Sequence, residues 1–375
     1  MRIAMITDSY YPTRDGVVTS ITITKKALED QGHEVFIVAP DPGESQRMDD
    51  VIYIGAIKFK SYDGYFIPIK PSDALKRLED LDVDVIHIHG VAVMALRGWY
   101  YAKKLNKPVV MTFHTMVGDV LGYYSPVNLD PDFLEKWMWK YLRFILRRMD
   151  SVIVPTPGIG RELASKAEGL DICVIPTGTD VDRFHPGIDG SSLRERYGLG
   201  DRKVVAHVSR LSYEKNIDLV IRSMMDIDAM LVIAGSGPCE KDLKSLVQEL
   251  GMQDKVVFTG FLDGADLPMV YGLADVVVSA SEFETQGLSI LEAMACGVPV
   301  VCRDARAFHD IITDGRNGYL FSDPEGLTDA IRRGLAASDE VIEGELETAQ
   351  ENSRERSAAK LLELYGNVIS KRRCE

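Results

Sequence analysis

The sequence lacks long apolar segments. No uninterrupted hydrophobic stretch among its 375 residues approaches the roughly 18 that a membrane-spanning helix needs. Met1 leads directly into a strand-like pattern, Arg2–Thr7, rather than into the basic and apolar regions of a signal peptide. We therefore expect a protein that stays in the cytoplasm.

Cysteine is scarce, and its spacing matches neither a metal site nor a redox pair. The five cysteines are Cys173, Cys239, Cys296, Cys302 and Cys374. Cys296 and Cys302 have apolar neighbours, which predicts buried thiols. His87 and His89 alternate along an apolar segment, but no carboxylate at ligand spacing joins them. We expect them to face the core or the floor of a cleft, and we expect no disulfide and no metal.

Positive charge is also in deficit, since the net charge is −14. Nucleic-acid phosphates would be repelled, so a nucleic-acid partner is not expected. The deficit is uneven: residues 1–185 carry 22 Lys and Arg against 25 Asp and Glu, while the remaining residues carry 21 against 32. The first part is thus almost neutral, and the second part carries most of the negative charge.

Two nucleotide-binding signatures are missing. The loop after the first predicted strand reads Asp15-Gly16-Val17-Val18-Thr19 instead of Gly-x-Gly-x-x-Gly, which disfavours a dinucleotide-dependent dehydrogenase. No Asp-x-Asp motif stands out near a nucleotide loop. Gly16 can be an ordinary turn residue, or it can let a phosphate approach the backbone.

Strand-like and helical patterns alternate along the chain, which predicts an α/β protein with two doubly wound parallel sheets. The first series of predicted strands is Arg2–Thr7, Glu34–Ala39, Val85–Ile88, Val109–Thr112 and Ser151–Val154, and the second is Lys203–Val208, Met230–Ala234, Val256–Thr259, Asp275–Ser279 and Pro299–Cys302. We expect Rossmann-like domains over 1–182 and 183–352, with a cleft between them, and a last helix over 353–375. The acidic segment Ser338–Glu351 is predicted to be flexible.

The segment Ser281–Val301 is the most informative part of the chain. Glu284 lies in a predicted strand-to-helix loop, and Glu292 lies in the helix that begins near Gly287. The first N–H groups of a helix, Gly287 and Leu288 here, attract an anion such as a phosphate. Carboxylates accept hydrogen bonds from sugar and ribose hydroxyls. In isolation two such glutamates are more often solvated surface charges.

Three further segments favour a binding site over solvated surface charges. They are Thr7–Pro12 with Asp15-Gly16-Val17-Val18, then Thr112-Phe113-His114-Thr115, and Ser209-Arg210-Leu211-Ser212-Tyr213-Glu214-Lys215-Asn216. Together with the Glu-x7-Glu pair, and in this order, they resemble glycosyltransferase family 4, whose members retain anomeric configuration and have the GT-B fold. One position departs from the family pattern, because Asn216 stands where glycine is usual.

The resemblance implies transfer of a hexose from a nucleoside diphosphate sugar, of UDP-glucose or GDP-mannose type, to an acceptor hydroxyl. Arg210 and Lys215 would hold the diphosphate in place of a metal. Glu284 and His114 would face the donor sugar, and Glu292 would bind the ribose. His114 could equally be a buried structural histidine. Gly235 and Gly237 follow a strand and either contact the nucleotide or serve packing alone.

The acceptor is indicated by a helix in the first part. Lys136, Lys140, Arg143 and Arg147 form a basic stripe at helical spacing, flanked by Trp137, Trp139 and Phe144. Such a helix is typical of contact with anionic lipid, although an ordinary surface helix can show the same pattern. The Thr7–Val17 and Thr112–Met116 segments are most similar to the diacylglycerol glucosyltransferase branch of the family.

A membrane lipid such as diacylglycerol is therefore the expected acceptor, reached from the inner face of the membrane. A soluble acceptor, such as a sugar, a sugar phosphate or an inositol phosphate, is the alternative. Two other classes remain as alternatives: a nonhydrolysing sugar-nucleotide epimerase, which shares the two-domain architecture, and a noncatalytic sugar-nucleotide sensor. The epimerase would not need the Glu284/Glu292 arrangement, and the sensor would bind donor without transferring it.

Overall fold

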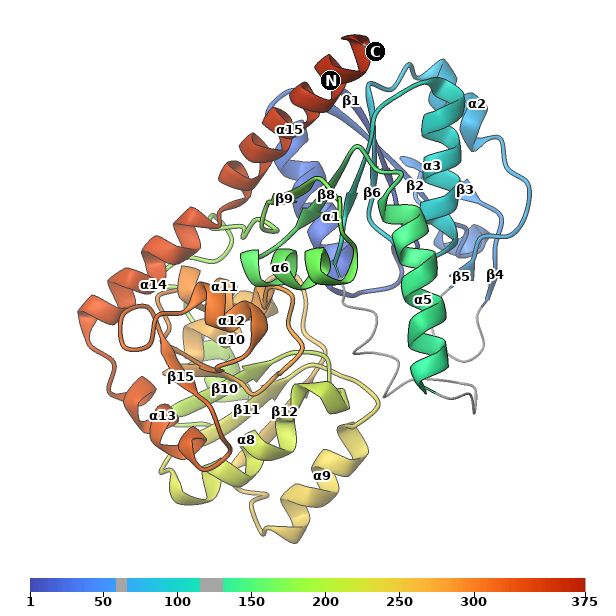
Figure 1. Ribbon diagram of the computed structural model, residues 1–375. Helices are drawn as coiled ribbons and strands as arrows, with labels where there is room; N and C mark the ends of the chain where they lie inside the picture. Colours follow the sequence, from blue (N-terminus) through green and yellow to red (C-terminus); the bar gives the residue numbers. More distant parts are fainter. Residues whose placement is uncertain (59–65, 115–130, 375) are drawn as a thin grey trace. The chain divides into compact units, whose positions relative to one another are not determined.

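The computed structural model describes residues 1–58, 66–114 and 131–374, which form two compact units (Figure 1). Unit 1 consists of Met1–Gly178 together with Arg354–Glu375, and unit 2 consists of Thr179–Ser353. Each unit is an α/β layer structure around its own parallel sheet. The last helix therefore belongs to the unit that contains the N-terminus.

Unit 1 has a seven-stranded parallel sheet in the order β3-β2-β1-β6-β7-β8-β9. Its strands are β1 Arg2–Ile6, β2 Glu34–Pro40, β3 Val51–Ile54, β6 Val85–Ile88, β7 Val109–Thr112, β8 Ser151–Val154 and β9 Ile172–Val174, and a separate pair is formed by β4 Ile57–Lys58 and β5 Phe66–Ile67. All five strands predicted for this part are confirmed, and β3 and β9, which lie at the two edges of the sheet, were missed.

The helices of unit 1 cover both faces of the sheet. They are α1 Gly16–Glu29, η1 Glu44–Gln46, α2 Ala74–Asp80, α3 Val93–Leu105, α5 Pro131–Leu146, α6 Pro157–Lys166 and α15 Arg354–Cys374. Successive side chains of a strand point to opposite faces. Ile3 and Met5 accordingly pack with α1 and α15, which lie side by side in Figure 1, whereas Ala4 and Ile6 pack with α2, α3, α5 and α6.

Unit 2 repeats this plan with a six-stranded parallel sheet in the order β12-β11-β10-β13-β14-β15. Its strands are β10 Val204–Val208, β11 Met230–Ala234, β12 Val256–Gly260, β13 Val276–Ser279, β14 Val300–Arg303 and β15 Tyr319–Phe321. Its helices are α7 Ser191–Arg196, η2 Tyr213–Lys215, α8 Ile217–Ser223, η3 Met224–Asp226, α9 Glu240–Glu249, α10 Asp266–Leu273, α11 Leu288–Ala295, α12 Arg306–Ile311, α13 Gly326–Leu335 and α14 Asp339–Glu351. The five predicted strands are confirmed, and β15 was missed.

The acidic segment 338–351 is not flexible, contrary to the sequence prediction. It forms α14, which packs against α11 and places Glu345 in the interior with no exposed surface. The Glu345 carboxylate accepts a hydrogen bond from the Val300 N–H at 2.9 Å. Burial raises the pKa of Glu345 to about 8, so this one carboxyl of the acidic segment is a core group that is mostly neutral at pH 7.

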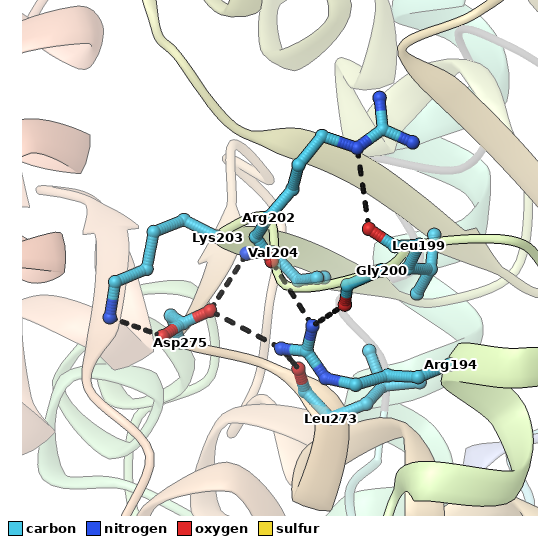
Figure 2. A network of polar contacts seen from close by, with 8 residues as sticks. All are labelled: Arg194, Leu199, Gly200, Arg202, Lys203, Val204, Leu273 and Asp275. Atoms are coloured by element: carbon cyan, nitrogen blue, oxygen red, sulfur yellow. Dashed lines mark hydrogen bonds and ion pairs between the residues drawn. The ribbon is translucent and has the colours of Figure 1, made fainter.

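A charged network at the amino-terminal edge of the unit 2 sheet is structural (Figure 2). Arg194 donates to the carbonyl groups of Gly200, Arg202 and Leu273 at 3.0, 3.1 and 2.9 Å. Asp275 accepts from the Val204 N–H at 2.8 Å and from Lys203 Nζ at 2.6 Å. These bonds join the starts of β10 and β13, at the opposite edge from the loops that follow the strands.

Candidate functional site

Four neighbouring strands of unit 2 place the predicted donor-binding residues at one edge of the sheet. The strands β11, β10, β13 and β14 are adjacent and parallel, so the loops that follow them emerge together. These loops contain Gly235 and Gly237, then Arg210 and Lys215, then Glu284 and Gly287. Ligands of open α/β sheets bind at this edge.

Lys215 and Glu284 are in direct contact. Lys215 Nζ forms an ion pair with Glu284 Oε1, which joins the loop after β10 to the loop after β13. Their side chains are 19% and 20% exposed, so the pair is largely withdrawn from water. Arg210 lies in the same loop as Lys215 and is exposed. The sequence placed Lys215 and Glu284 in one site without indicating that they touch.

Asn216 accounts for the departure from the Lys-Gly pattern. Its backbone is left-handed, with φ 48° and ψ 42°, a region that glycine adopts freely and that asparagine tolerates better than most other residues. Its side-chain Nδ2 donates to the carbonyl oxygen of Ala280 at 3.2 Å. Asparagine therefore supplies the turn that glycine would give, and it also ties this loop to the Glu284 loop.

Gly235 and Gly237 are required by packing. A Cβ at Gly235 would lie 1.8 Å from the carbonyl oxygen of Ser209, and one at Gly237 would lie 2.3 Å from that of Leu211. Their loop bonds to the Arg210 loop through Leu211 N–H and the Ser236 carbonyl, at 3.0 Å. The glycines thus hold the loop that carries Arg210, and contact with a nucleotide stays a prediction.

The helix α11 begins as the sequence predicts, with Gly287 as its N-cap and Leu288 as its first residue. Gly287 has φ 80°, and a Cβ there would lie 2.4 Å from the ring of Phe308. Glu292 is half-buried and accepts a hydrogen bond from Tyr271 Oη at 2.6 Å. Burial raises the pKa of Glu292 to about 7, and the Tyr271 hydrogen bond opposes that rise.

Sequence reasoning missed two arginines that contact the Glu284 loop from its other side. Arg303 at the end of β14 forms an ion pair with Glu282 at 2.7 Å, and the Arg306 guanidinium lies 5.3 Å from the ring centre of Phe283. Arg306 has a left-handed backbone with φ 42°, which is unfavourable for a long side chain. Arg303 ends β14 and Arg306 follows it, and this position beside β13 was the signal that could have indicated them.

Unit 1 places Asp15, Gly16 and His114 at the corresponding edge of its own sheet. Asp15 is the N-cap of α1 and accepts from the Val18 N–H at 2.8 Å. The helix begins at Gly16. No described atom lies within 4 Å of a Cβ built at Gly16, and its φ is not in the left-handed region. The described fold therefore does not require glycine there.

His114 follows β7, and its Nε2 lies 3.1 Å from His89 Nδ1. His87 and His89 are both buried, which agrees with the prediction that they face the core or the floor of a cleft. Burial lowers the pKa of His114 to about 4, although the Asp15 carboxylate acts in the opposite direction. Thr115, the last residue of the Thr112–Thr115 motif, lies outside the described residues.

The helix α5 presents an exposed face of interleaved aromatic and basic side chains, which we call the α5 face. Its members are Phe133, Lys136, Trp137, Lys140, Arg143, Phe144 and Arg147. Phe133, Trp137 and Phe144 are 57%, 64% and 43% exposed. The Arg143 Nε is less available, since it donates to the carbonyl oxygen of Lys166 at 2.7 Å.

Trp139 does not belong to this face, contrary to the sequence prediction. It is 4% exposed and packs in the unit 1 core with Leu142 and Ile145. Successive helical residues are separated by about 100°, so Trp139 points away from Trp137 and Lys140 toward the sheet. The helical spacing alone could have shown that 137 and 139 cannot share one narrow face.

The α5 face continues onto α3. The Phe144 and Trp99 rings lie edge to face with their centres 6.2 Å apart, and Arg148 lies over both rings. Lys103 and Lys104 lie over the rings of Trp99 and Tyr100 at 5.7 and 5.8 Å. The sequence indicated a single helix, whereas the structure brings a second basic and aromatic helix beside it.

Two features are absent from the described part of the chain. Within it, His, Cys, Asp and Glu side chains form no group of three or more that could hold a metal ion. None of its helices is both long and apolar enough to cross a membrane.

Two protein-family descriptions match the chain in succession. Glycosyltransferase Family 4 matches residues 14–183, and Glycosyl transferases group 1 matches residues 191–356. An alpha-monoglucosyldiacylglycerol synthase from Streptococcus pneumoniae is 34% identical over 98% of this chain and 86% of its own length. The chain belongs to glycosyltransferase family 4. This member of the family is a hexosyltransferase that uses a nucleotide sugar.

Other relatives agree with this assignment. A protein of the same name from Acholeplasma laidlawii is 29% identical over 87% of this chain and 86% of its own length. The crystal structure of Anabaena HepE in complex with UDP-glucose is similar in fold, with a TM-score of 0.76, 18% identity, and coverage of 97% of this chain and 99% of that one. The two parallel-sheet units are those of a GT-B glycosyltransferase.

Proposed function

We propose that this enzyme transfers a hexose, with retention of configuration, from a nucleoside diphosphate sugar to the hydroxyl of a membrane lipid, with diacylglycerol as the first candidate. The observation that supports a lipid acceptor is the exposed α5 face together with the neighbouring basic and aromatic residues of α3. The names of the relatives from Streptococcus pneumoniae and Acholeplasma laidlawii support it. UDP-glucose is the first candidate donor, and a GDP-mannose-type donor is the second.

The proposed donor site uses the unit 2 loops. Lys215 and Arg210 would bind the diphosphate and offset the charge that grows as the sugar bond breaks. Entry of a diphosphate would draw Lys215 away from Glu284 and release that carboxylate to accept hydrogen bonds from the sugar hydroxyls. The ion pair therefore keeps both groups ordered before the donor arrives.

The N-terminus of α11 and its glutamate complete this site. The N–H groups of Gly287 and Leu288 would donate to diphosphate oxygens. Tyr271 donates to Oε2 of Glu292, so Oε1 is the oxygen that would accept from the ribose hydroxyls. In unit 1, Gly16 would allow a ligand to approach the start of α1, and His114 would face the donor sugar.

The reaction needs little proton donation to the leaving group, because a nucleoside diphosphate is a good leaving group. Electrostatic stabilisation by fixed cations and helix N–H groups suits such a step. We expect activity to survive a chelator such as EDTA, since Arg210 and Lys215 already supply positive charge. A complete dependence on added divalent metal would contradict this assignment of the two cations.

The α5 face would bind the inner surface of the membrane, which makes the enzyme a peripheral cytoplasmic protein. Exposed aromatic rings sit in the headgroup region, and each cation near an anionic surface contributes roughly 1 kcal/mol. The unit 1 sequence is almost neutral overall, whereas most of the negative charge lies later in the chain. The positive face is therefore not cancelled by its own unit.

Vesicle binding tests this proposal. Lys136→Glu/Lys140→Glu should weaken binding to anionic vesicles at least tenfold, because about 2 kcal/mol of attraction is lost. Lys76→Glu/Arg77→Glu on α2 is the matched control, since it makes the same charge change at two exposed residues of the same unit. Equal and negligible binding of the parent to anionic and neutral vesicles would remove the membrane step.

A product screen by mass spectrometry distinguishes the acceptors. Diacylglycerol in mixed micelles should yield a monohexosyl product with UDP-glucose or with GDP-mannose. Product only with a sugar, a sugar phosphate or an inositol phosphate would make the soluble acceptor the function of this enzyme. Mutation of Glu284 to Ala should lower the rate of product formation about a hundredfold with every acceptor that is used.

A further inference from the structure

A row of buried rings crosses unit 1 from the last helix to His114. Tyr365 on α15 lies with its Oη 2.6 Å from His87 Nδ1, and His87 Nε2 lies 2.7 Å from Thr112 Oγ1. The His87 and His89 ring centres are 3.9 Å apart. His89 Nδ1 lies 3.1 Å from His114 Nε2. Every ring in the row is thus held by its neighbour.

The three histidines are neutral near pH 7. Burial lowers the pKa of His87 to about 3 and that of His114 to about 4, and it moves the pKa of His89 in the same direction. A neutral imidazole has one N–H donor and one bare nitrogen acceptor. Which nitrogen carries the proton then determines what each ring can bind.

The unused nitrogen of His89 indicates where its proton lies. His89 Nε2 is buried and has no hydrogen-bond partner among the residues that the structure describes. A buried N–H group without an acceptor is costly and rare, whereas a bare acceptor is tolerated better. The proton of His89 is therefore favoured on Nδ1, where His114 Nε2 can accept it.

We propose that His89 is a positioning residue that donates from Nδ1 to Nε2 of His114 and holds the His114 ring with its own proton on Nδ1. This inference rests on the proposed function in one respect, the assignment of His114 to the donor sugar. In this arrangement Nε2 of His114 is occupied and cannot take a proton from the acceptor. His114 would instead act as a hydrogen-bond donor through Nδ1.

His87 contacts the ring of His89, and Tyr365 contacts His87. Because Tyr365 belongs to α15, the last helix contributes to this arrangement across a sequence separation of 278 residues from His87. Its hydroxyl fixes the His87 ring, and the His87 ring stacks on His89. Tyr365→Phe would remove the hydroxyl while keeping the packing of the phenyl ring.

Two substitutions at His89 test the roles of its two nitrogens separately. The amide nitrogen of asparagine lies close to the position of Nδ1 in histidine, and that of glutamine lies close to Nε2. We expect His89→Asn to keep kcat within about threefold of the parent, and His89→Gln to lower it by roughly tenfold to a hundredfold, the loss expected for one hydrogen bond to a positioned group. Thermal unfolding of both variants checks that the fold is retained.

The tautomer of His114 gives a readout that a purely structural role would not move. In protein labelled with ¹⁵N-histidine, the His114 signals, assigned by their loss in His114→Gln, should show the proton on Nδ1 in the parent and in His89→Asn. In His89→Gln this tautomer should no longer be fixed. A proton on Nε2 of His114 in the parent would overturn the proposal, as would an unchanged tautomer and kcat in His89→Gln.

This readout is independent of the acceptor. If no lipid is glycosylated but the tautomer behaves as described, the proposed function fails and the role of His89 stands. If lipid is glycosylated but the tautomer is different, the role of His89 fails alone. If both variants unfold, the His114 tautomer in the spectrum of the parent decides whether the role of His89 stands.

Discussion

The contact between Lys215 and Glu284 leads to a prediction about how their effects combine. Each residue is expected to stabilise the transition state by about 3 kcal/mol, so Lys215→Ala and Glu284→Ala should each lower kcat/KM about a hundredfold. If the two acted independently, the double variant would lose roughly ten thousandfold in rate. Because they form a largely buried ion pair, each loss also misplaces the remaining partner.

We therefore expect a double variant that is much more active than the product of the single losses, with a coupling energy of about 0.5–3 kcal/mol. The assay is the initial rate of hexosyl transfer at several donor concentrations, with unfolding measured in parallel. Lys26→Ala is the matched control, since Lys26 forms an ion pair with Asp30 at 3.1 Å on the exposed surface of unit 1. Strictly additive losses, or unchanged activity in either single variant, would refute the reasoning.

Three further predictions concern other residues of unit 2. The pKa of Glu345 is raised from 4.5 to about 8, so between these pH values the folded protein keeps a proton that the unfolded chain has lost. The resulting contribution to stability is complete below pH 4.5 and disappears as pH rises through 8. Glu345→Gln should therefore flatten the decline in unfolding free energy between pH 5 and pH 8, measured by urea unfolding. Arg194→Ala should lower the unfolding free energy by about 2–4 kcal/mol, because three backbone carbonyl groups lose their Arg194 donor and Asp275 loses one of its partners. Arg306→Gly keeps the left-handed backbone without cost and removes the guanidinium, so it should be more stable than Arg306→Ala by about 1 kcal/mol and equal to it in any loss of activity.

Each of these has a result that contradicts it. Identical pH dependence in Glu345→Gln and the parent would mean that Glu345 is ionised when folded. An unchanged unfolding midpoint in Arg194→Ala would show that the carbonyl groups find water instead. Equal stability of the glycine and alanine variants at Arg306 would mean that its backbone is not left-handed in solution. Arg77→Ala on the exposed surface of α2 is a control for loss of an arginine as such.

Much of the fold could be predicted from the sequence because its central strands are short apolar runs between helical patterns. Strands β6, β7, β8 and β11 were located to the residue, and the strand-to-helix loop at Glu284 was recognised from Gly287 and the spacing of Leu288 and Leu291. The edge strands β3, β9 and β15 were missed although the edge strand β12 was found, because an edge strand depends on its one neighbour in the sheet, and a local pattern does not show that neighbour.

The candidate residues came from the sequence, and their relations came only from tertiary structure. Local pattern identifies a loop or a helix, but it does not show which loops meet, so the Lys215–Glu284 pair and the link from Tyr365 to His114 could not be read from the chain. The burial of individual residues also came only from the tertiary structure. Glu345 in an acidic segment and Trp139 in a basic one are core residues because of what packs on them, and that is decided by elements far away in sequence.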